Sequence, residues 1–498
     1  MSVAALMTAV SACDGGHPAV TTRPPPIATD MAAFTSQRPA WKPCGGGQKA
    51  LCAHVKVPLS YEDPAGGTIS LALNRFPATG RKKGSLLVNP GGPGGSGLEF
   101  AAWVAQTPVA AAYDVVGFDP RGVGASGQIH CLGQAEHDAY YNAPLAPTTA
   151  DGRKQRRQAA KNLAHMCGER YRALLPRVGT DSTAQDMEVM RSILGDSKLN
   201  FLGASYGTLI GQYYAERYPA RVGRMYLDSV MDPARSLPDI VRDNAHSAQQ
   251  TFERFVDHCL SHGSCPLGTS RRQAQDRVLQ MIDKLDAQPA PAAADPKRPV
   301  TGSDLRSAIG QGIEKAAVWP QLTQALDQAA TGNLDGIRQL ADAAHDREDN
   351  GTFSGEDETF IAVACTLASP QQRSHQALDR AITDATRTSP VFGPLDLFRP
   401  CADWPAHAPV TPHKLTADTP GPLLLANNTV DPATPLHWAK AASQGLHDAT
   451  LVSNAGTGHG FMVMGPCTQR IMAKYLTDGA VPKAGTMCKD TGLKSAPP

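Results

Sequence analysis

The sequence lacks any uninterrupted apolar run long enough to cross a membrane as a helix, which excludes a multi-span membrane protein. It also lacks an excess of charge of one sign: 47 Lys and Arg face 46 Asp and Glu, leaving a net charge of +1. This balance gives no electrostatic basis for binding nucleic acid or an acidic membrane surface. No C-x-x-C pair and no tight Cys/His group occurs at ligand spacing. We expect no metal and no organic cofactor.

What is present is typical of a large globular protein, with 498 residues, of which 41% are hydrophobic and 19% charged. Residues 1–13 contain a small apolar stretch that resembles the second half of a secretion signal. They end in Val-Ser-Ala-Cys, which resembles a bacterial lipobox and predicts lipidation of Cys13. The alternative is a chance cysteine, because no basic segment precedes the apolar stretch. Residues 14–40 are rich in Pro and Thr and are predicted to form an extended tether.

The chain has 11 cysteines, and ten remain when Cys13 is set aside. An even number together with an export-like start predicts disulfides, an oxidising compartment and a secreted or cell-surface protein. The spacing alone does not select one connectivity. Because short loops close most easily, we predict that each cysteine pairs with its neighbour. The predicted pairs are Cys44–Cys52, Cys131–Cys167, Cys259–Cys265, Cys365–Cys401 and Cys467–Cys488.

The hydrophobic pattern is that of an α/β protein from about residue 41 onward. Alternating residues predict antiparallel strands at 53–61 and 68–76, and short apolar runs predict buried strands at 85–90, 113–120, 199–205, 224–230, 422–428 and 449–456. Helical periodicity follows at 181–194, 206–218, 435–445 and 465–477. Residues 233–405 are polar, Ala-rich and helix-like. We therefore predict an α/β-hydrolase core formed by 41–232 and 406–498, with 233–405 inserted as a helical cap over the carboxyl edge of the sheet.

The segment Gly203-Ala204-Ser205-Tyr206-Gly207 fits the G-x-S-x-G pattern of a nucleophile elbow. A predicted strand leads into it and a predicted helix leads out, which is the context that the pattern requires. We expect a strained turn that exposes the hydroxyl of Ser205 as the nucleophile, with the helix N-terminus beside the developing oxyanion. The alternative is a bystander serine in a glycine-rich turn.

A serine nucleophile needs a base and an orienting acid, which follow in the order serine, acid, histidine in this fold. Asp431 comes just after the strand at 422–428, and His459 lies in a glycine-flanked loop after the last predicted strand. We predict these two residues as acid and base. Asp228 and Asp232 follow the strand before the cap and are the alternative acids.

Residues 89–97 read NPGGPGGSG and follow the predicted strand at 85–90. No Lys-Ser/Thr follows the glycines, so this is not a phosphate-binding P-loop. In an α/β-hydrolase this loop supplies the second oxyanion donor. We expect the main-chain N–H groups of Gly92 and Tyr206 to form the oxyanion hole, the alternative being a plain flexible loop.

The motifs GGPGGSG, DPRGVGAS, GASYG, DPATP and GHG occur in this order, with CADWP before the fourth. Together they resemble the secreted tripeptidyl aminopeptidases of actinobacteria, which are α/β-hydrolases related to proline iminopeptidases. The resemblance implies cleavage of short N-terminal peptides, with Ser205, Asp431 and His459 as the triad and a cap that closes the cleft. It further implies that acidic residues hold the free amino group of the substrate, and that Asp119 and Arg121 are structural.

The chain departs from this family where an acidic residue is expected shortly after Cys365, because the sequence there is CTLAS. The nearest acids are Glu356, Asp357 and Glu358. We interpret them as a solvated charged turn, or alternatively as the site for the substrate amine.

The sequence is compatible with three functions. The first is an exported serine aminopeptidase that releases short N-terminal peptides, with tripeptides as the expected product, through an acyl-enzyme. The second is a carboxylesterase that uses the same triad on small or lipid esters. The third is a substrate-binding lipoprotein with an inactive site. Peptides are the expected partners in the first case, with membrane contact only through the lipid on Cys13.

Overall fold

The computed structural model describes residues 31–45, 49–263 and 265–490. The predicted signal segment 1–13, with Cys13, and the tether up to residue 30 lie outside the described residues. Within the last part of the predicted tether, α1 (Ala32–Thr35) buries Phe34 in the main core. The prediction of an extended chain is therefore wrong for these residues, because Phe34 removes its apolar surface from water by packing against the main core.

The core is a single ten-stranded sheet with the order β1-β2-β3-β5-β4-β6-β7-β8-β9-β10. The β1–β2, β2–β3 and β3–β5 pairs are antiparallel, and all others are parallel. This confirms the predicted strands and the α/β-hydrolase fold class. The strands are β1 (Lys42–Pro43), β2 (Leu51–Pro58), β3 (Thr68–Phe76), β4 (Ser85–Asn89), β5 (Asp114–Phe118), β6 (Leu199–Ala204), β7 (Val222–Asp228), β8 (Leu424–Val430), β9 (Thr450–Thr457) and β10 (Met487–Cys488).

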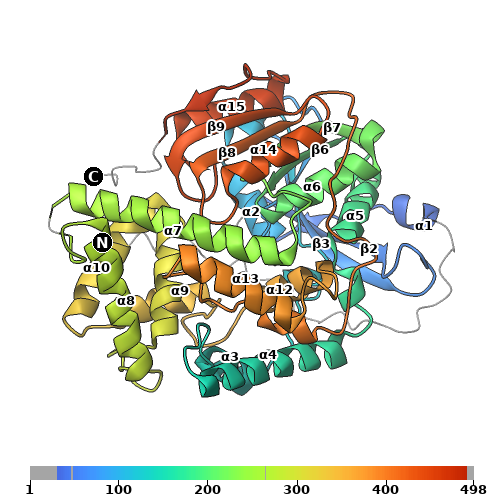
Figure 1. Ribbon diagram of the computed structural model, residues 1–498. Coiled ribbons are helices and arrows are strands. Elements are labelled where there is room, and N and C mark those ends of the chain that lie inside the picture. Colours follow the sequence, from blue (N-terminus) through green and yellow to red (C-terminus); the bar gives the residue numbers. More distant parts are fainter. Residues whose placement is uncertain (1–30, 46–48, 264, 491–498) are drawn as a thin grey trace.

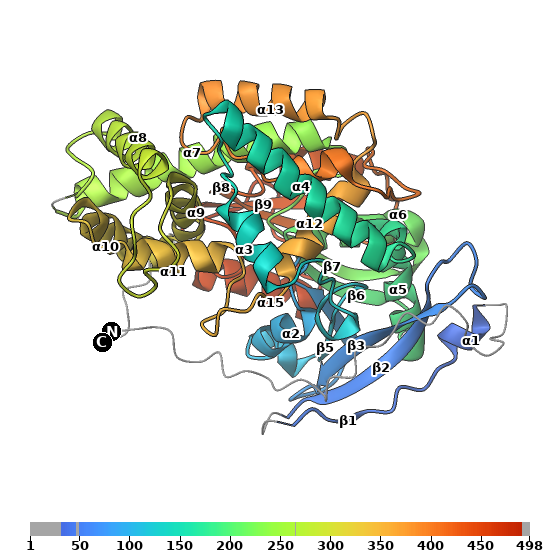
Figure 2. The same cartoon turned by 90° about the horizontal axis from the view of Figure 1, so that it is seen from below.

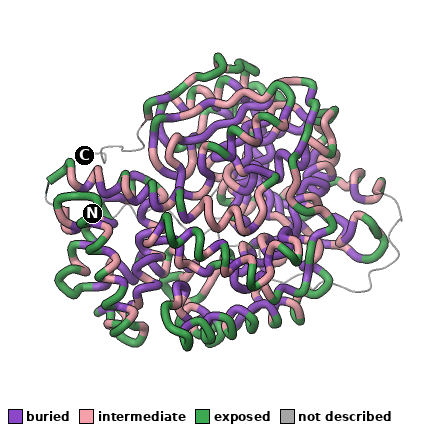
Figure 3. The backbone as a smooth tube through the Cα atoms, in the orientation of Figure 1, coloured by how far each residue is buried: buried purple, intermediate pink, exposed green. Residues whose placement is uncertain are grey.

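Helices cover both faces of this sheet, and buried segments concentrate between the layers (Figure 3). One face packs against α2 (Gly97–Val104) and α15 (Pro466–Asp478). The other packs against α5 (Thr180–Ile193), α6 (Tyr206–Arg217) and α14 (Leu436–Gly445). The central strands β4 and β5 are mostly apolar because both of their faces are buried.

Seven helices lie between β7 and β8 in the sequence and form the helical region that the sequence predicts there (Figures 1 and 2). The first five of them share an apolar core of their own, in which Phe255 and Trp319 are buried, whereas the sixth packs into the main core. None of the described helices is long and apolar enough to cross a membrane. The seven are α7 (Leu237–Ser261), α8 (Arg271–Ala287), α9 (Gly302–Ile313), α10 (Trp319–Ala330), α11 (Asp335–Ala344), α12 (Glu356–Leu367) and α13 (His375–Thr388).

Two helices that the sequence pattern did not reveal, α3 (Gln134–Asn142) and α4 (Ala150–Tyr171), lie beside this region (Figure 2). Both helices precede β6 in the chain. They nevertheless contact the segment that follows α13, because the buried guanidinium of Arg156 on α4 donates to the carbonyl of Asp396 at 3.0 Å. The layer over the carboxyl edge of the sheet is therefore built from two separate stretches of chain.

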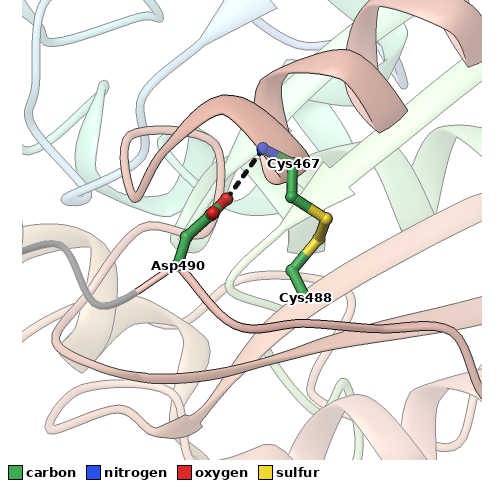
Figure 4. Close-up of side chains that lie close together, drawn as sticks. All are labelled: Cys467, Cys488 and Asp490. Atoms are coloured by element: carbon green, nitrogen blue, oxygen red, sulfur yellow. Dashed lines mark hydrogen bonds between the residues drawn. A yellow bond between two sulfur atoms is a disulfide. The ribbon is translucent and has the colours of Figure 1, made fainter.

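All five predicted disulfides are present, so the neighbour-pairing rule is confirmed. The pair Cys467–Cys488 lies beside Asp490, a grouping that could suggest a metal site. Figure 4 shows instead that the two sulfur atoms are bonded to each other and that the Asp490 carboxylate turns to the N–H of Cys467. The same carboxylate accepts from the N–H of Thr468, so it caps the first turn of α15.

A fully buried ion pair holds the sheet to α5. The guanidinium of Arg121 donates to Asp186 at 2.6 and 2.8 Å, and neither side chain is exposed. Tyr61 donates to the same carboxylate at 2.7 Å, so the charge is hydrogen-bonded as well as paired. This agrees with the structural role expected for Arg121. A second pair on the same helix, Asp181–Arg217, is partly exposed.

We predict that Asp186→Asn lowers the free energy of unfolding by about 3–5 kcal/mol, because it leaves the guanidinium of Arg121 buried without its counter-charge. Asp181→Asn is the matched control and should cost about 0–1 kcal/mol, since its pair is solvent-screened. Urea unfolding of both variants measures the difference. Equal losses in the two variants would contradict the role given to burial.

Candidate active site

Ser205 stands at the junction of β6 and α6 in a left-handed conformation, with φ of 53°. Its N–H donates to the carbonyl of Asp228 at 2.9 Å, which extends the pairing of β6 with β7 by one step. The flanking glycines are required by contact: a Cβ on Gly203 would lie 2.5 Å from the carbonyl oxygen of Gly207. The turn is therefore the strained elbow that the sequence predicts, with the serine at its tip.

Asp431 and His459, the predicted acid and base, are in direct contact. Nδ1 of His459 lies 2.9 and 3.0 Å from the two carboxylate oxygens of Asp431, whose side chain is fully buried. The N–H groups of Ala433 and Thr434 each donate to the same carboxylate at 2.9 Å. This arrangement fixes the imidazole with Nδ1–H toward the carboxylate. Nε2 is then the nitrogen that can accept a proton.

The alternative acids, Asp228 and Asp232, have other partners. The Asp228 carboxylate accepts from the N–H groups of Phe461 and Met462, each at 2.7 Å. It thus anchors the loop that follows His459, and burial raises the pKa of this carboxyl to about 6. Asp232 pairs with Arg235 at 3.1 Å. The geometry places Asp431, and neither of the alternatives, against Nδ1 of the imidazole.

The glycine loop at 89–97 packs directly on the elbow. A Cβ on Gly91 would lie 2.6 Å from the main-chain nitrogen of Tyr206, so only glycine fits there. The N–H of Gly92 donates to no described group, and that of Tyr206 is at the first position of α6, where helices have no internal acceptor. Both residues line one cavity with Ser205. This is the arrangement expected of an oxyanion hole.

Sequence reasoning missed Glu314, which follows the last turn of α9 and has no motif around it. Its carbonyl accepts from the N–H of His459 at 2.7 Å, and Lys315 forms an isolated β-bridge with Gly458. Burial by itself would lower the pKa of His459, but the carboxylates of Asp431, Glu314 and Asp228 outweigh it and raise the pKa to about 9. The helical cap thus contributes a charge to the environment of the predicted base.

The acids of the 356–358 segment form the first turn of α12, and the interpretation as a solvated charged turn is wrong for two of them. Glu358 is buried and accepts from the N–H groups of Cys131 and Leu132, each at 2.8 Å. Asp357 accepts from the hydroxyl of Tyr141. Glu356 is the most exposed of the three, and its carboxylate faces the glycine loop: a Cβ on Gly92 would lie 3.6 Å from its Oε1.

Comparison with known proteins shows the family of the chain. The family described as alpha/beta hydrolase fold matches residues 84–465. Serine protease Hip1 of Mycobacterium tuberculosis is 31% identical over 471 residues, covering 90% of each chain. Tripeptidyl aminopeptidase of Streptomyces coelicolor is 32% identical over 460 residues, covering 88% of this chain and 82% of that protein. The chain belongs to the tripeptidyl aminopeptidase family of α/β-hydrolases.

The protein is therefore an enzyme, a serine hydrolase similar to tripeptidyl aminopeptidases. The family also includes a protein of another stated activity, since carboxylesterase B of Mycobacterium tuberculosis is 33% identical over 455 residues, covering 88% of this chain and 86% of that one. Membership of the family thus gives the class of chemistry, whereas the choice of substrate has to be argued from this chain's own residues.

We predict that Asp431→Asn lowers kcat by about ten-thousand-fold, the order of magnitude for amidation of a triad aspartate, because the imidazole loses its orienting acceptor. Asp228→Asn should cost far less activity and mainly lower the melting temperature, because that carboxylate holds a loop. Steady-state kinetics and thermal unfolding of both variants compare the two. The reverse order in kcat would assign the acid to Asp228.

We predict that kcat/KM for a p-nitrophenyl ester rises with pH toward a midpoint near 9, because only the neutral imidazole of His459 can accept a proton. In Glu314→Gln the midpoint should move to lower pH, since one carboxylate that stabilises the imidazolium is gone. An ester without an amine is used so that substrate titration does not contribute. Asp327→Asn, at an exposed site on α10, is the control and should leave the midpoint in place. An unmoved midpoint in Glu314→Gln would contradict the electrostatic role of the cap.

Proposed function

We propose that the enzyme is an exported serine aminopeptidase that releases short N-terminal peptides from oligopeptides. Ser205 Oγ attacks the scissile carbonyl while Nε2 of His459 takes its proton. The tetrahedral oxyanion is held by the N–H groups of Gly92 and Tyr206, and one such donor contributes about 3 kcal/mol to transition-state stabilisation. His459 then passes the proton to the leaving amine, which leaves an acyl-enzyme on Ser205. A water activated by His459 hydrolyses this ester and frees the peptide.

The observation that carries the proposal is the carboxylate of Glu356 beside the oxyanion loop. Burial of the carboxyl raises the pKa of Glu356 to about 7, and the neighbouring carboxylates of Asp346 and Asp357 add to the shift. Glu314 contributes to the same negative potential and lines an adjoining cavity under the cap. A bound cation would relieve this repulsion. The free α-amino group of a peptide, with a pKa of about 7.7–8.0, is such a cation.

The second candidate is a carboxylesterase that uses the same triad. It is supported by the similarity to carboxylesterase B and by the apolar cavity beside Ser205. An ester substrate has no use for a carboxylate at the oxyanion loop, which is why the aminopeptidase is favoured. Dependence on a free amine separates the two functions.

We extend the proposal to the location of the enzyme and to the division of its chain into a core and a cap. Five disulfides support an oxidising compartment, so we propose a secreted or cell-surface enzyme with Cys13 as its lipid anchor. The division into a core of 41–232 and 406–498 and a cap of 233–405 is part of the same proposal.

We predict that a tripeptide aminocoumarin with a free N-terminus is cleaved much faster than its N-acetylated twin or a p-nitrophenyl ester. Glu356→Gln should lower kcat/KM for the free tripeptide about tenfold or more, since a hydrogen bond to a charged group contributes about 1.5–3 kcal/mol. The acetylated twin should be little affected. Glu136→Gln, at an exposed glutamate on α3, is the matched control. A fast ester with no effect of acetylation would favour the carboxylesterase.

A further inference from the structure

Helix α12 has one face turned toward the elbow. After Glu356, the residues at helical spacing on this face are Phe360, Val363, Ala364 and Leu367, which are all apolar. These four residues line a cavity that also contacts Ser205. The same helix thus presents a carboxylate at the glycine loop and an apolar surface next to the nucleophile.

This cavity has a volume of about 150 Å³. Gly92, Ser205 and Tyr206 are at the nucleophile end, so any group bound in the cavity is adjacent to the reacting atoms. The remaining wall is formed mainly by apolar side chains from the core, α7 and the segments around α14. The main contributors besides the α12 face are Leu209, Met231, Leu237, Ile240, Phe398 and Trp438.

The charged groups in the cavity wall lie close to groups of opposite sign. Nε of Arg235 lies 3.1 Å from the carboxylate of Asp232 and 3.5 Å from that of Asp243. These two carboxylates offset the charge of the guanidinium. A charged side chain entering this cavity would lose hydration without gaining a partner.

The position of the cavity relative to the predicted base indicates which part of a substrate it receives. Because His459 delivers the proton to the leaving nitrogen, the leaving group has to lie on the His459 side of the scissile carbonyl. The cavity is lined by both predicted oxyanion donors, and His459 is not among its lining residues. The group attached to the acyl carbon is therefore the one that faces it.

We propose that this cavity binds the side chain of the residue whose carbonyl is attacked, and that it selects an uncharged aliphatic or single-ring side chain there. The inference rests on the proposed function and adds the substrate class to it. An apolar cavity of about 150 Å³ accommodates benzene, so side chains of the size of Leu, Met or Phe fill it. Gly and Ala leave it empty, and Asp and Lys place a charge in it.

The test is a panel of free tripeptides Ala-Ala-X-aminocoumarin, with X as Gly, Ala, Leu, Phe, Asp or Lys. Because the leaving group is the same in every substrate, differences in kcat/KM within the panel report only on residue X. Since a few apolar atoms in a pocket change kcat/KM about 10- to 200-fold, Leu and Phe should exceed Gly by about tenfold or more. Asp and Lys should not exceed Gly. A panel that is flat in X, or that favours Asp or Lys, overturns the proposal.

Ala364→Phe fills the cavity from the α12 side and should reduce the Leu-to-Gly ratio of kcat/KM about tenfold. Ala364→Leu is a smaller change that should reduce the ratio less, and it serves if the first variant does not fold. Labelling of Ser205 by a fluorophosphonate reports that each variant is folded. Ala287→Phe, at the exposed end of α8, is the matched control and should keep the wild-type ratio. An equal loss for Leu and Gly substrates in the Ala364 variants overturns the proposal.

Failure of the peptidase activity gives a different result. If no peptide turns over but the fluorophosphonate labels Ser205, the proposed function fails, and p-nitrophenyl acetate, butyrate and hexanoate replace the panel. The cavity then predicts a preference for the longer acyl chains that Ala364→Phe reverses. The absence of that preference overturns the cavity assignment as well.

Discussion

The constraint on which the site depends is that β6, β7 and β8 are adjacent and parallel, with Ala204 paired beside Asp228 and Asp228 beside Ala426. Ser205 follows the first, Asp228 ends the second and Asp431 follows the third. The pairing of β7 with β8 brings together segments that the whole cap separates in the sequence. Once this register is formed, a serine, a loop anchor and an orienting carboxylate meet at one edge without further adjustment.

The histidine loop is fixed from two sides of the molecule. The core contributes the Asp228 carboxylate, which binds the N–H groups just after His459, and the cap contributes the carbonyl of Glu314 to the N–H of His459 itself. Helix α12 is joined to the end of the cap by the disulfide Cys365–Cys401. The helix that carries Glu356 is thus fixed within the cap, and the cap also contacts the loop of the predicted base, so a change in the cap can alter that base.

Sequence reasoning reached the parts of the site that depend on local chemistry. The elbow around Ser205 is a pattern of adjacent residues, and Asp431 and His459 follow from the chain order of the fold. Glu314 could not be found in this way. It contributes its carbonyl and its charge from the end of α9, where the sequence carries no recognisable motif. The burial of Glu358 depends on contacts with His137 and the Cys131 region, more than 200 residues away in the chain. Such pairings between distant segments leave no periodic signal.

The disulfides have a consequence for biogenesis. Their partners are separated by 8, 36, 6, 36 and 21 residues, and no bridge overlaps the next in the sequence. In a chain threaded through an export channel from its N-terminus, each thiol therefore meets its partner before the first thiol of the following pair has emerged. With Cys13 set aside, oxidation of the other ten thiols in strict order of emergence yields the native connectivity, so such a chain has no need of an isomerase to reshuffle its bridges.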